Sequence, residues 1–362
     1  MTDTKKDTAR LSFDSKERAL SLLRTLIRSR YIAEVLPSAA ELSRILRIPK
    51  TAIDYSLEEL TKQRLIEART GEIGYHYIQR ANPPSGEVIL VVNRDILRGW
   101  YSLILDWMIG VEETLFEEGY ELRAYSGFHS AQEKMAKIAE ARHHGCMGVV
   151  LPNHVEPQVI AQLVRDKIPA VTLGNATLNQ EEIGCICSDN RAGMEKLLAH
   201  LFSENHKRIA MYVTGLNVHD GYRERFLTYQ QVMRQHGQDT CLDMVFYDNH
   251  TERSARRAAE IYYGLTTKPT AIVCGSDREA FELVSELHHL KIEVPKHVSV
   301  VGFDNNHFGQ MLEPPMTTID IYSSQMGRVA ANYLLNEMQT PQLPVKILLP
   351  TELIVRGSTL KR

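Results

Sequence analysis

Apolar residues recur along the first 80 positions at two different spacings, which predict helices followed by a hairpin. In KERALSLLRTLIRS, Leu20, Leu23 and Ile27 are separated by three or four residues, as on one face of a helix. A second helix is predicted in SAAELSRIL, because Ser38 fits the N-cap and Glu41 follows three residues later, as in a capping box. The segment RLIEARTGEIGYHYIQR instead alternates on both sides of a glycine-containing turn, which predicts a two-stranded hairpin.

A third helix is predicted from about Pro49 to Gln63. Ile53, Leu57 and Leu60 share one face of it, and Pro49 fits the first helical position, where a missing N–H costs nothing. Helix, helix, short turn, helix and hairpin is the layout of a winged helix-turn-helix, whose third helix enters the major groove of DNA. A small helical docking module is the alternative. The residues expected to contact DNA are Ser38, Arg44, Arg47, Lys50, Thr51, Tyr55 and Arg69.

The segment ANPPSGE, residues 81–87, is the clearest domain boundary, because proline, glycine and serine are typical of linkers. We therefore expect a DNA-binding domain at 1–80, a linker at 81–87 and a larger domain at 88–362. In the larger domain, strand-like segments alternate with amphipathic helices such as 190–204, which predicts two α/β subdomains with parallel sheets. The strand-like segments are 88–93, 120–125, 147–152, 168–174, 208–215, 244–247, 270–275 and 298–304.

Charge distinguishes the two parts of the chain. Residues 1–80 contain 15 lysines and arginines against 11 acidic residues, a net charge of +4, whereas the remainder carries −7. A basic N-terminal part favours a polyanionic partner, although +4 is also within ordinary surface variation. No segment approaches the roughly 18 apolar residues that span a bilayer. The start MTDTKKDTAR lacks the apolar stretch of a secretion signal, so we expect a cytoplasmic protein.

The sequence contains no signature of catalysis, cofactor binding or metal binding that we recognise. GxGxxG, the P-loop, GxSxG and HExxH are all missing. The pairs His143–His144 and His288–His289 are adjacent in helices, where neighbours do not share a face, so we expect surface residues rather than metal ligands. Cys185 and Cys187 alternate within a strand-like run, which favours buried thiols. We expect no enzyme activity and no cofactor.

Residues 36–68, LPSAAELSRILRIPKTAIDYSLEELTKQRLIEA, resemble the DNA-binding head of the GntR family. The likeness extends over about 65 residues, and it departs at Pro49 and Lys50, where the family has Ser-Arg. The arginine of that family usually contacts phosphate or base, and Lys50 keeps its charge. The matching positions are Leu36, Pro37, Ser38, Leu42, Leu46, Leu57, Leu60, Leu65 and Ile66.

Residues 87–359 resemble the effector-binding part of the LacI family, whose fold is that of periplasmic sugar-binding proteins. The segments that carry the likeness are SDNRAGMEKLLAHLFSENHKRIAMY, RERFLTYQQVM, KPTAIVCGSDREAF, VPKHVSVVGFDNNHFGQMLEPPMTTIDIYSSQMGRVAANYLL and LPTELIVRGST. Asn205, Thr228 and Ser276 replace the Gly, Gly and Asn of the family pattern.

This resemblance implies an effector cleft between two subdomains. By it, Arg225 fixes a ligand oxygen through charge-assisted hydrogen bonds, and Asp304 accepts hydrogen bonds from ligand hydroxyls. Ser276 is at a position where many family members contact the ligand through Asn. At the end of the first strand, Asn93, Arg94 and Asp95 are further candidates, and Trp100 or Tyr101 either stacks on a sugar or belongs to the core.

Two aspartates have a structural alternative. Asp189 and Asp277 are family positions, yet an aspartate at a helix start is most simply an N-cap or first-turn residue. We favour the structural role for Asp277 and leave both roles open for Asp189, which we keep among the effector candidates.

A GntR-like head joined to a LacI-like body is the arrangement of arabinose-repressor-type regulators. The resemblance implies a homodimer on a two-fold symmetric, double-stranded operator, with a small-molecule effector that changes operator affinity. We expect a repressor released by a sugar. A sugar-binding protein for transport would need an export signal, and a sugar-modifying enzyme would need a nucleophile and base that Arg225 and Asp304 do not provide.

Overall fold

The structure is a computed structural model of the 362-residue chain. It describes residues 16, 19–20, 22–24, 35–46, 48–63, 66–68, 75–77, 86–152, 155–174, 182–216, 220–238, 242–249, 251 and 253–362. The predicted DNA contacts Arg47 and Arg69 lie outside the described residues, as does Cys241.

The described residues of the N-terminal part form helices and a small antiparallel sheet in the order that the hydrophobic pattern predicts. The elements are β1 (Val35–Leu36), α2 (Ala39–Leu46), α3 (Lys50–Lys62), β2 (Ile66–Ala68) and β3 (Tyr75–Tyr77), and the described residues between 16 and 24 are helical. Strand β3 pairs antiparallel with both β1 and β2. One apolar cluster joins these elements: Leu20, Leu23, Leu36, Leu42, Ile53, Leu57, Leu60 and Ile66.

The helix starts in this part show one confirmed prediction and one that was wrong. The Ser38 hydroxyl accepts a hydrogen bond from the backbone N–H of Glu41 at 3.3 Å, as predicted for the N-cap of α2. Pro49 was predicted to be the first helical residue, but α3 begins at Lys50 and Pro49 is its N-cap, with φ −52° and ψ 134°. That ψ is extended, while the Pro49 carbonyl already accepts hydrogen bonds from Ala52 and Ile53.

The chain divides into two compact units. The first joins Met1–Cys187 with Ser324–Ile347, and the second joins Ser188–Ser323 with Leu348–Arg362. The chain therefore passes from one unit to the other three times, within β8, at the start of α12 and within β14.

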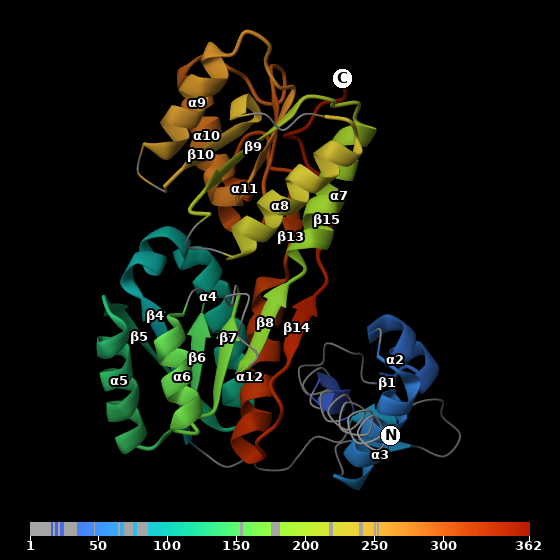
Figure 1. Cartoon of the computed structure of the whole chain (residues 1–362), viewed down its shortest axis with the longest axis vertical. Helices are drawn as coiled ribbons and strands as arrows, with labels where there is room; N and C mark the ends of the chain where they lie inside the picture. Colours follow the sequence, from blue (N-terminus) through green and yellow to red (C-terminus); the bar gives the residue numbers. More distant parts are fainter. Residues whose placement is uncertain are drawn as a thin grey trace, which may run out of the picture. The chain divides into compact units, whose positions relative to one another are not determined.

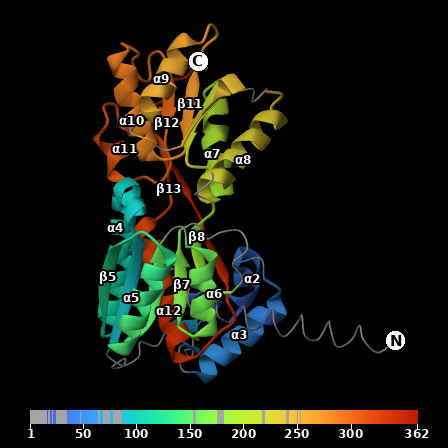
Figure 2. The ribbon, with the colours of Figure 1, turned by 60° about the vertical axis from the view of Figure 1, so that its left-hand side comes forward.

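A six-stranded sheet with helices on both faces forms the larger part of the first unit (Figure 1). The strand order is β14-β8-β7-β6-β4-β5, and the pairs from β8 to β5 are parallel. In both views α5 and α6 cover one face while α4 and α12 cover the other (Figure 2). The strands are β4 (Gly86–Asn93), β5 (Tyr120–Phe128), β6 (Cys146–Pro152), β7 (Ala170–Leu173), β8 (Gly184–Ser188) and β14 (Lys346–Leu349); the helices are α4 (Arg94–Glu117), α5 (Ala131–His143), α6 (Pro157–Arg165) and α12 (Ser323–Gln339).

Two glycines let α4 and α12 approach closely. A Cβ on Gly110 would meet the backbone oxygen of Ser324 at 1.9 Å, and one on Gly327 would meet that of Trp107 at 2.2 Å. Strand β4 begins at Gly86, two residues inside the segment 81–87 that was predicted to be a linker.

The second unit contains a parallel four-stranded sheet in the order β10-β9-β11-β12. Helices α9 and α10 pack on one face around the cluster that includes Tyr212, Phe246 and Leu283. The strands are β9 (Ile209–Thr214), β10 (Val245–Asp248), β11 (Ala271–Cys274), β12 (Ser299–Val301), β13 (Thr318–Asp320) and β15 (Glu352–Ile354), the last two forming an antiparallel pair. The helices are α7 (Asn190–Ser203), α8 (Asp220–Gln235), α9 (Ser254–Gly264), α10 (Asp277–His289), α11 (His307–Met311) and the 3-10 turn Leu242–Met244.

All eight predicted strands of the larger part are present, and the predicted helix 190–204 is α7. Strands β13, β14 and β15 were not predicted. The four cysteines that the structure describes are buried free thiols, as expected. Among the described residues, no helix has both the length and the apolar composition that a membrane crossing requires.

Candidate functional site

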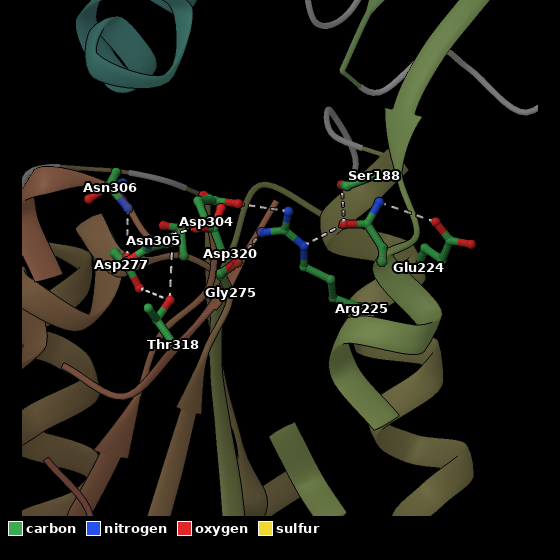
Figure 3. A network of polar contacts seen from close by, with 12 residues as sticks. Ser188, Glu224, Arg225, Gly275, Asp277, Asp304, Asn305, Asn306, Thr318 and Asp320 are labelled. Carbon is green, nitrogen blue, oxygen red and sulfur yellow. Dashed lines mark hydrogen bonds and ion pairs between the residues drawn. The ribbon is translucent and has the colours of Figure 1, made fainter. Parts of the chain in front are cut away.

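Arg225 is at the centre of a buried polar network in the second unit (Figure 3). Its Nη2 donates to Asp304 Oδ1 at 2.9 Å, its Nη1 to the carbonyl oxygen of Gly275 at 2.6 Å, and its Nε to Asn190 Oδ1 at 2.8 Å. The side chains of Arg225 and Asp304 are only 4% and 2% exposed. Helix α8, helix α7 and the segments after β11 and β12 thus converge on one guanidinium, at the carboxyl ends of the parallel strands where ligands of open α/β sheets bind.

Aromatic rings and charge together hold this pair. The Arg225 guanidinium carbon lies 3.7 Å from the centroid of the Phe303 ring, a cation–π distance. Burial raises the pKa of Asp304 to about 6, while the neighbouring Arg225 opposes that rise. Breaking such a buried pair by removing one partner typically costs about 3–5 kcal/mol, because the remaining charge is left without compensation.

The turn after β12 presents Asp304. Asp304 and Asn305 have φ values of +102° and +50°, a region that few residues other than glycine adopt. Asp277 anchors the same turn, since its carboxylate accepts hydrogen bonds from the backbone N–H of Asn306 at 2.9 Å and from Thr318 Oγ1 at 2.5 Å. Burial raises the pKa of Asp277, and these two hydrogen bonds oppose the rise. Asp277 is thus a first-turn residue of α10 with a structural role, as favoured from the sequence.

A second buried acid lies beside this network. Glu279 Oε1 accepts hydrogen bonds from the backbone N–H and the hydroxyl of Thr214, at 2.8 and 2.6 Å. Glu279 Oε2 is buried without a hydrogen-bond partner among the described residues. Burial raises the pKa of Glu279 to about 8, so the group is mostly neutral at pH 7. Ser276, which was predicted to contact the effector, is the N-cap of α10, and its hydroxyl accepts from the backbone N–H of Glu279 at 3.2 Å.

This arrangement is suited to binding a ligand rich in hydroxyl groups. Arginine has five N–H donors, and Arg225 uses three of them on acceptors in the part of the chain that the structure describes. Asp304 Oδ2 likewise accepts no hydrogen bond from a described residue, so the pair offers both donors and an acceptor. Among the described residues of the site, no nucleophile has a neighbouring base to activate it, as acyl or glycosyl transfer would need.

Not all predicted effector residues belong to this network. Asn93 ends β4, Arg94 begins α4 and Tyr101 lies within α4, so all three are in the first unit, where the structure describes their backbone only. Asp189 is the N-cap of α7, since its Oδ1 accepts from the backbone N–H of Ala192 at 2.9 Å. The Asp189 side chain therefore caps the helix, which is the structural role that the sequence offered as an alternative to effector binding.

The predicted DNA contacts lie on α2 and α3 where the structure describes them. Arg44 is in the last turn of α2, with a side chain that is 77% exposed. Lys50 begins α3, 58% exposed, with Nζ at 2.8 Å from Asp54 Oδ2. Thr51 is exposed, whereas Tyr55 is half-buried and packs against the apolar cluster, so little of its ring is available to a partner.

Sequence reasoning missed four polar residues of the site: Asn190, Glu279, Asn305 and Arg356. Asn190 and Asn305 directly follow predicted candidates, and the rule that ligand groups follow strand ends could have included them. Glu279 shares a helix face with Leu283 and Leu287, and an acid on an apolar face is a recognisable signal. No local pattern marks Arg356.

Comparison with known proteins agrees with this architecture. The family described as "Periplasmic binding protein-like domain" matches residues 198–359. The HTH-type transcriptional repressor CytR of Escherichia coli K12 is 26% identical over 326 residues, which cover 89% of this chain and 93% of the repressor. A LacI-type transcriptional regulator from Bacillus cereus subsp. cytotoxis superposes with a TM-score of 0.70 at 22% identity, over 77% of this chain and 100% of that one. The complex of the transcriptional regulator CelR with cellobiose superposes with a TM-score of 0.68 at 21% identity, over 89% of this chain and 99% of that one.

These similarities confirm a periplasmic-binding-protein-like α/β domain with parallel sheets, as found in LacI-family regulators. The relatives that match over 78–89% of this chain, CytR and the repressor PurR of Aliivibrio salmonicida, are transcriptional repressors, and transcriptional regulation is the function that the comparisons support.

Proposed function

We propose that this chain is a sequence-specific DNA-binding transcriptional repressor, and that a small molecule bound at the Arg225 network controls its affinity for an operator. The observation that carries the proposal is the buried Arg225–Asp304 pair at the carboxyl ends of the parallel strands, with donors and an acceptor to spare. The similarity to the repressor CytR over 89% of the chain supports the DNA-directed role.

For the N-terminal part we propose a winged helix-turn-helix of the GntR type that reads double-stranded DNA. The order of α2, α3 and the β2–β3 hairpin supports it, as does an exposed N-terminus of α3 that presents Lys50 and Thr51. In helix-turn-helix proteins the N-terminal residues of the second helix of the motif contact base edges. A two-fold symmetric operator requires a two-fold symmetric reader, so we propose a homodimer acting in the cytoplasm.

For the effector we propose a sugar or sugar derivative. An ion pair with unused hydrogen-bonding groups binds hydroxyl-rich ligands in preference to analogues with fewer hydroxyls, because each missing hydroxyl leaves a buried group of the protein unpaired. The nearly matched charges of Arg225 and Asp304 favour a neutral sugar over a phosphate. A sugar-binding protein or sugar-modifying enzyme without a DNA-directed role is the alternative, and failure to select any DNA sequence would favour it.

A thermal-shift screen tests the effector site. The ligands are pentoses, hexoses, cellobiose, sugar acids and sugar phosphates, each with the wild type and with Asp304→Asn, which keeps an acceptor for Arg225. A ligand at about 100 times its Kd adds roughly 2.7 kcal/mol to the free energy of unfolding. We expect a neutral sugar to raise the Tm of the wild type by several degrees and that of Asp304→Asn much less. An equal rise in both proteins would contradict the assigned site.

A further inference from the structure

The turn that presents Asp304 is held in an unfavourable backbone conformation. Asp304 and the following Asn305 both have positive φ, at +102° and +50°. Residues other than glycine adopt such values only where surrounding contacts overdetermine them. The main-chain N–H groups of Asp304, Asn305 and Asn306 donate to the carbonyl of Ile319 at 2.8 Å, to Thr318 Oγ1 at 3.4 Å and to Asp277 Oδ2 at 2.9 Å. These backbone hydrogen bonds hold the main chain of the turn, but they do not fix the direction of the Asp304 side chain.

Asn305 provides the additional contacts. Its Nδ2 donates to Asp320 Oδ2 at 2.8 Å, and its Oδ1 accepts from Arg356 Nη2 at 2.6 Å. Both ends of the Asn305 amide are therefore bound to charged groups, which makes these hydrogen bonds stronger than neutral ones. Figure 3 shows Asn305 and Asp320 beside Asp304.

We propose that Asn305 is the positioning residue of the effector site: its amide, held by Asp320 and Arg356, fixes the turn so that the Asp304 carboxylate meets Arg225. The effector part of this proposal rests on the function proposed above, whereas the effect on the ion pair does not. If the φ of Asn305 relaxed to a negative value, the preceding peptide would rotate, and Asp304 Oδ1 would leave its 2.9 Å contact with Arg225.

The contacts of Asn305 also reach the segments where the chain changes units. Asp320 ends β13, and its Oδ1 accepts a hydrogen bond from the backbone N–H of Tyr322 at 2.7 Å. Tyr322 directly precedes the passage at residues 323–324. Arg356 follows β15, which begins four residues after the passage at 347–348. The side chain of Asn305 thus joins the turn of Asp304 to the end of β13 and to the segment after β15, both of which lie near passages in sequence.

The substitution Asn305→Gly, made in the full chain, distinguishes the effect of the side-chain amide from the effect of the backbone conformation. Glycine adopts positive φ without a steric penalty, so this variant removes the two side-chain hydrogen bonds while it favours the same turn. The matched control is Asn205→Gly: Asn205 also has positive φ, at +66°, and its Nδ2 donates to the main-chain oxygen of Arg362 at 2.7 Å. Asn205 precedes β9, at the opposite ends of the strands from Arg225.

The readout is hydrogen exchange of the Arg225 guanidinium protons in protein labelled with [15N]arginine, assigned by their loss in Arg225→Lys. We expect exchange at least tenfold faster in Asn305→Gly than in the wild type, and no change in Asn205→Gly. Exchange within twofold of the wild type in Asn305→Gly would overturn the proposal. This readout needs no effector, so its outcome is independent of the proposed function.

A swap of the hydrogen-bonding groups tests the role against a merely structural one. Asn305→Asp sets a second carboxylate against Asp320, and we expect fast Arg225 exchange and effector binding at least tenfold weaker for a sugar identified by the thermal-shift screen. Adding Asp320→Asn restores a donor and an acceptor with their places exchanged, and both quantities should return to within about threefold of the wild type. If the double variant were no better than Asn305→Asp, the direct Asn305–Asp320 contact would not position Asp304.

Discussion

Glu279 illustrates what burial does to one side chain of the site. It lies on the otherwise apolar face of α10, completely enclosed, with one oxygen bound to Thr214 and the other without a described partner. The cost of burying a charge raises its pKa from 4.5 to about 8, although the hydrogen bonds from Thr214 oppose the rise. The folded protein therefore binds a proton at neutral pH that the unfolded chain releases.

A pH dependence of stability follows from this shift. Between pH 4.5 and 8 the folded state holds one more proton than the unfolded state, so the contribution is complete below pH 4.5 and is lost as the pH rises through 8. From pH 6 to pH 8, Glu279 should lower the free energy of unfolding by about 2 kcal/mol, at roughly 1.4 kcal/mol per unit. Urea unfolding at pH 6, 7 and 8 measures it.

Glu279→Gln is the matched variant, because the neutral amide keeps an acceptor for Thr214. Its free energy of unfolding should change less than that of the wild type over the same interval. Asp304, with a pKa of about 6, still titrates at the lower end of this interval, but it is present in both proteins, so its contribution largely cancels in the comparison. Parallel profiles for the two proteins would show that Glu279 is ionised in the folded state.

Single residues differ in how far the sequence could identify them. Arg225 and Asp304 are within segments that resemble a known family, and the structure brings them to 2.9 Å. Glu279 and Arg356 also lie within such segments, but their contacts are with residues 65 and 51 positions away, and no local pattern encodes such contacts. Ser276 and Asp189 show the reverse case, because the family likeness made both of them effector candidates, whereas the side chain of each caps a helix start.

At the scale of elements, α3 has one buried and one exposed side. Ile53, Leu57 and Leu60 are in the apolar cluster, while Lys50 and Thr51 are exposed at its N-terminus. The 2.8 Å pair of Lys50 with Asp54 is exposed, and such pairs contribute only about 0–1 kcal/mol, so DNA phosphate can replace Asp54 at little cost.

Lys50→Ala should therefore weaken operator binding about three- to tenfold and reduce the slope of log K against log salt by about 1, because one fewer counterion is released. Fluorescence anisotropy with an operator selected from random double-stranded DNA measures both quantities between 50 and 200 mM salt. Lys62→Ala is the control, since Lys62 is at the other end of α3 and pairs with Glu58 and Glu59. An unchanged slope for Lys50→Ala would contradict the placement of the reading helix.

Helices and strands could be predicted from the sequence where their apolar pattern extends over enough residues to be recognised. The eight predicted strands of the α/β body are mainly apolar over four or more residues of sequence, and α7 has apolar residues at helical spacing; all of these elements are present. Strands β13 and β15 are three residues each and pair across 32 positions, from Asp320 to Glu352, so tertiary structure rather than local pattern forms them. Pro49 was misplaced by one residue because a proline satisfies both the N-cap and the first helical position.

At the scale of the whole molecule, the chain passes three times between two compact units. Residues 324–347 belong to the first unit and residues 348–362 to the second, so neither unit is complete without a segment from the end of the chain. A ligand bound with different affinity to two conformations of such a chain shifts their populations by that difference in affinity.

The most direct test of the central claim is operator affinity with and without the effector, measured by anisotropy for the wild type and for Asp304→Asn. We expect a saturating sugar to weaken operator binding of the wild type at least tenfold, a coupling free energy of about 1.4 kcal/mol. The same sugar should change the affinity of Asp304→Asn less than twofold. An operator affinity in the wild type that does not respond to any bound sugar would contradict the account.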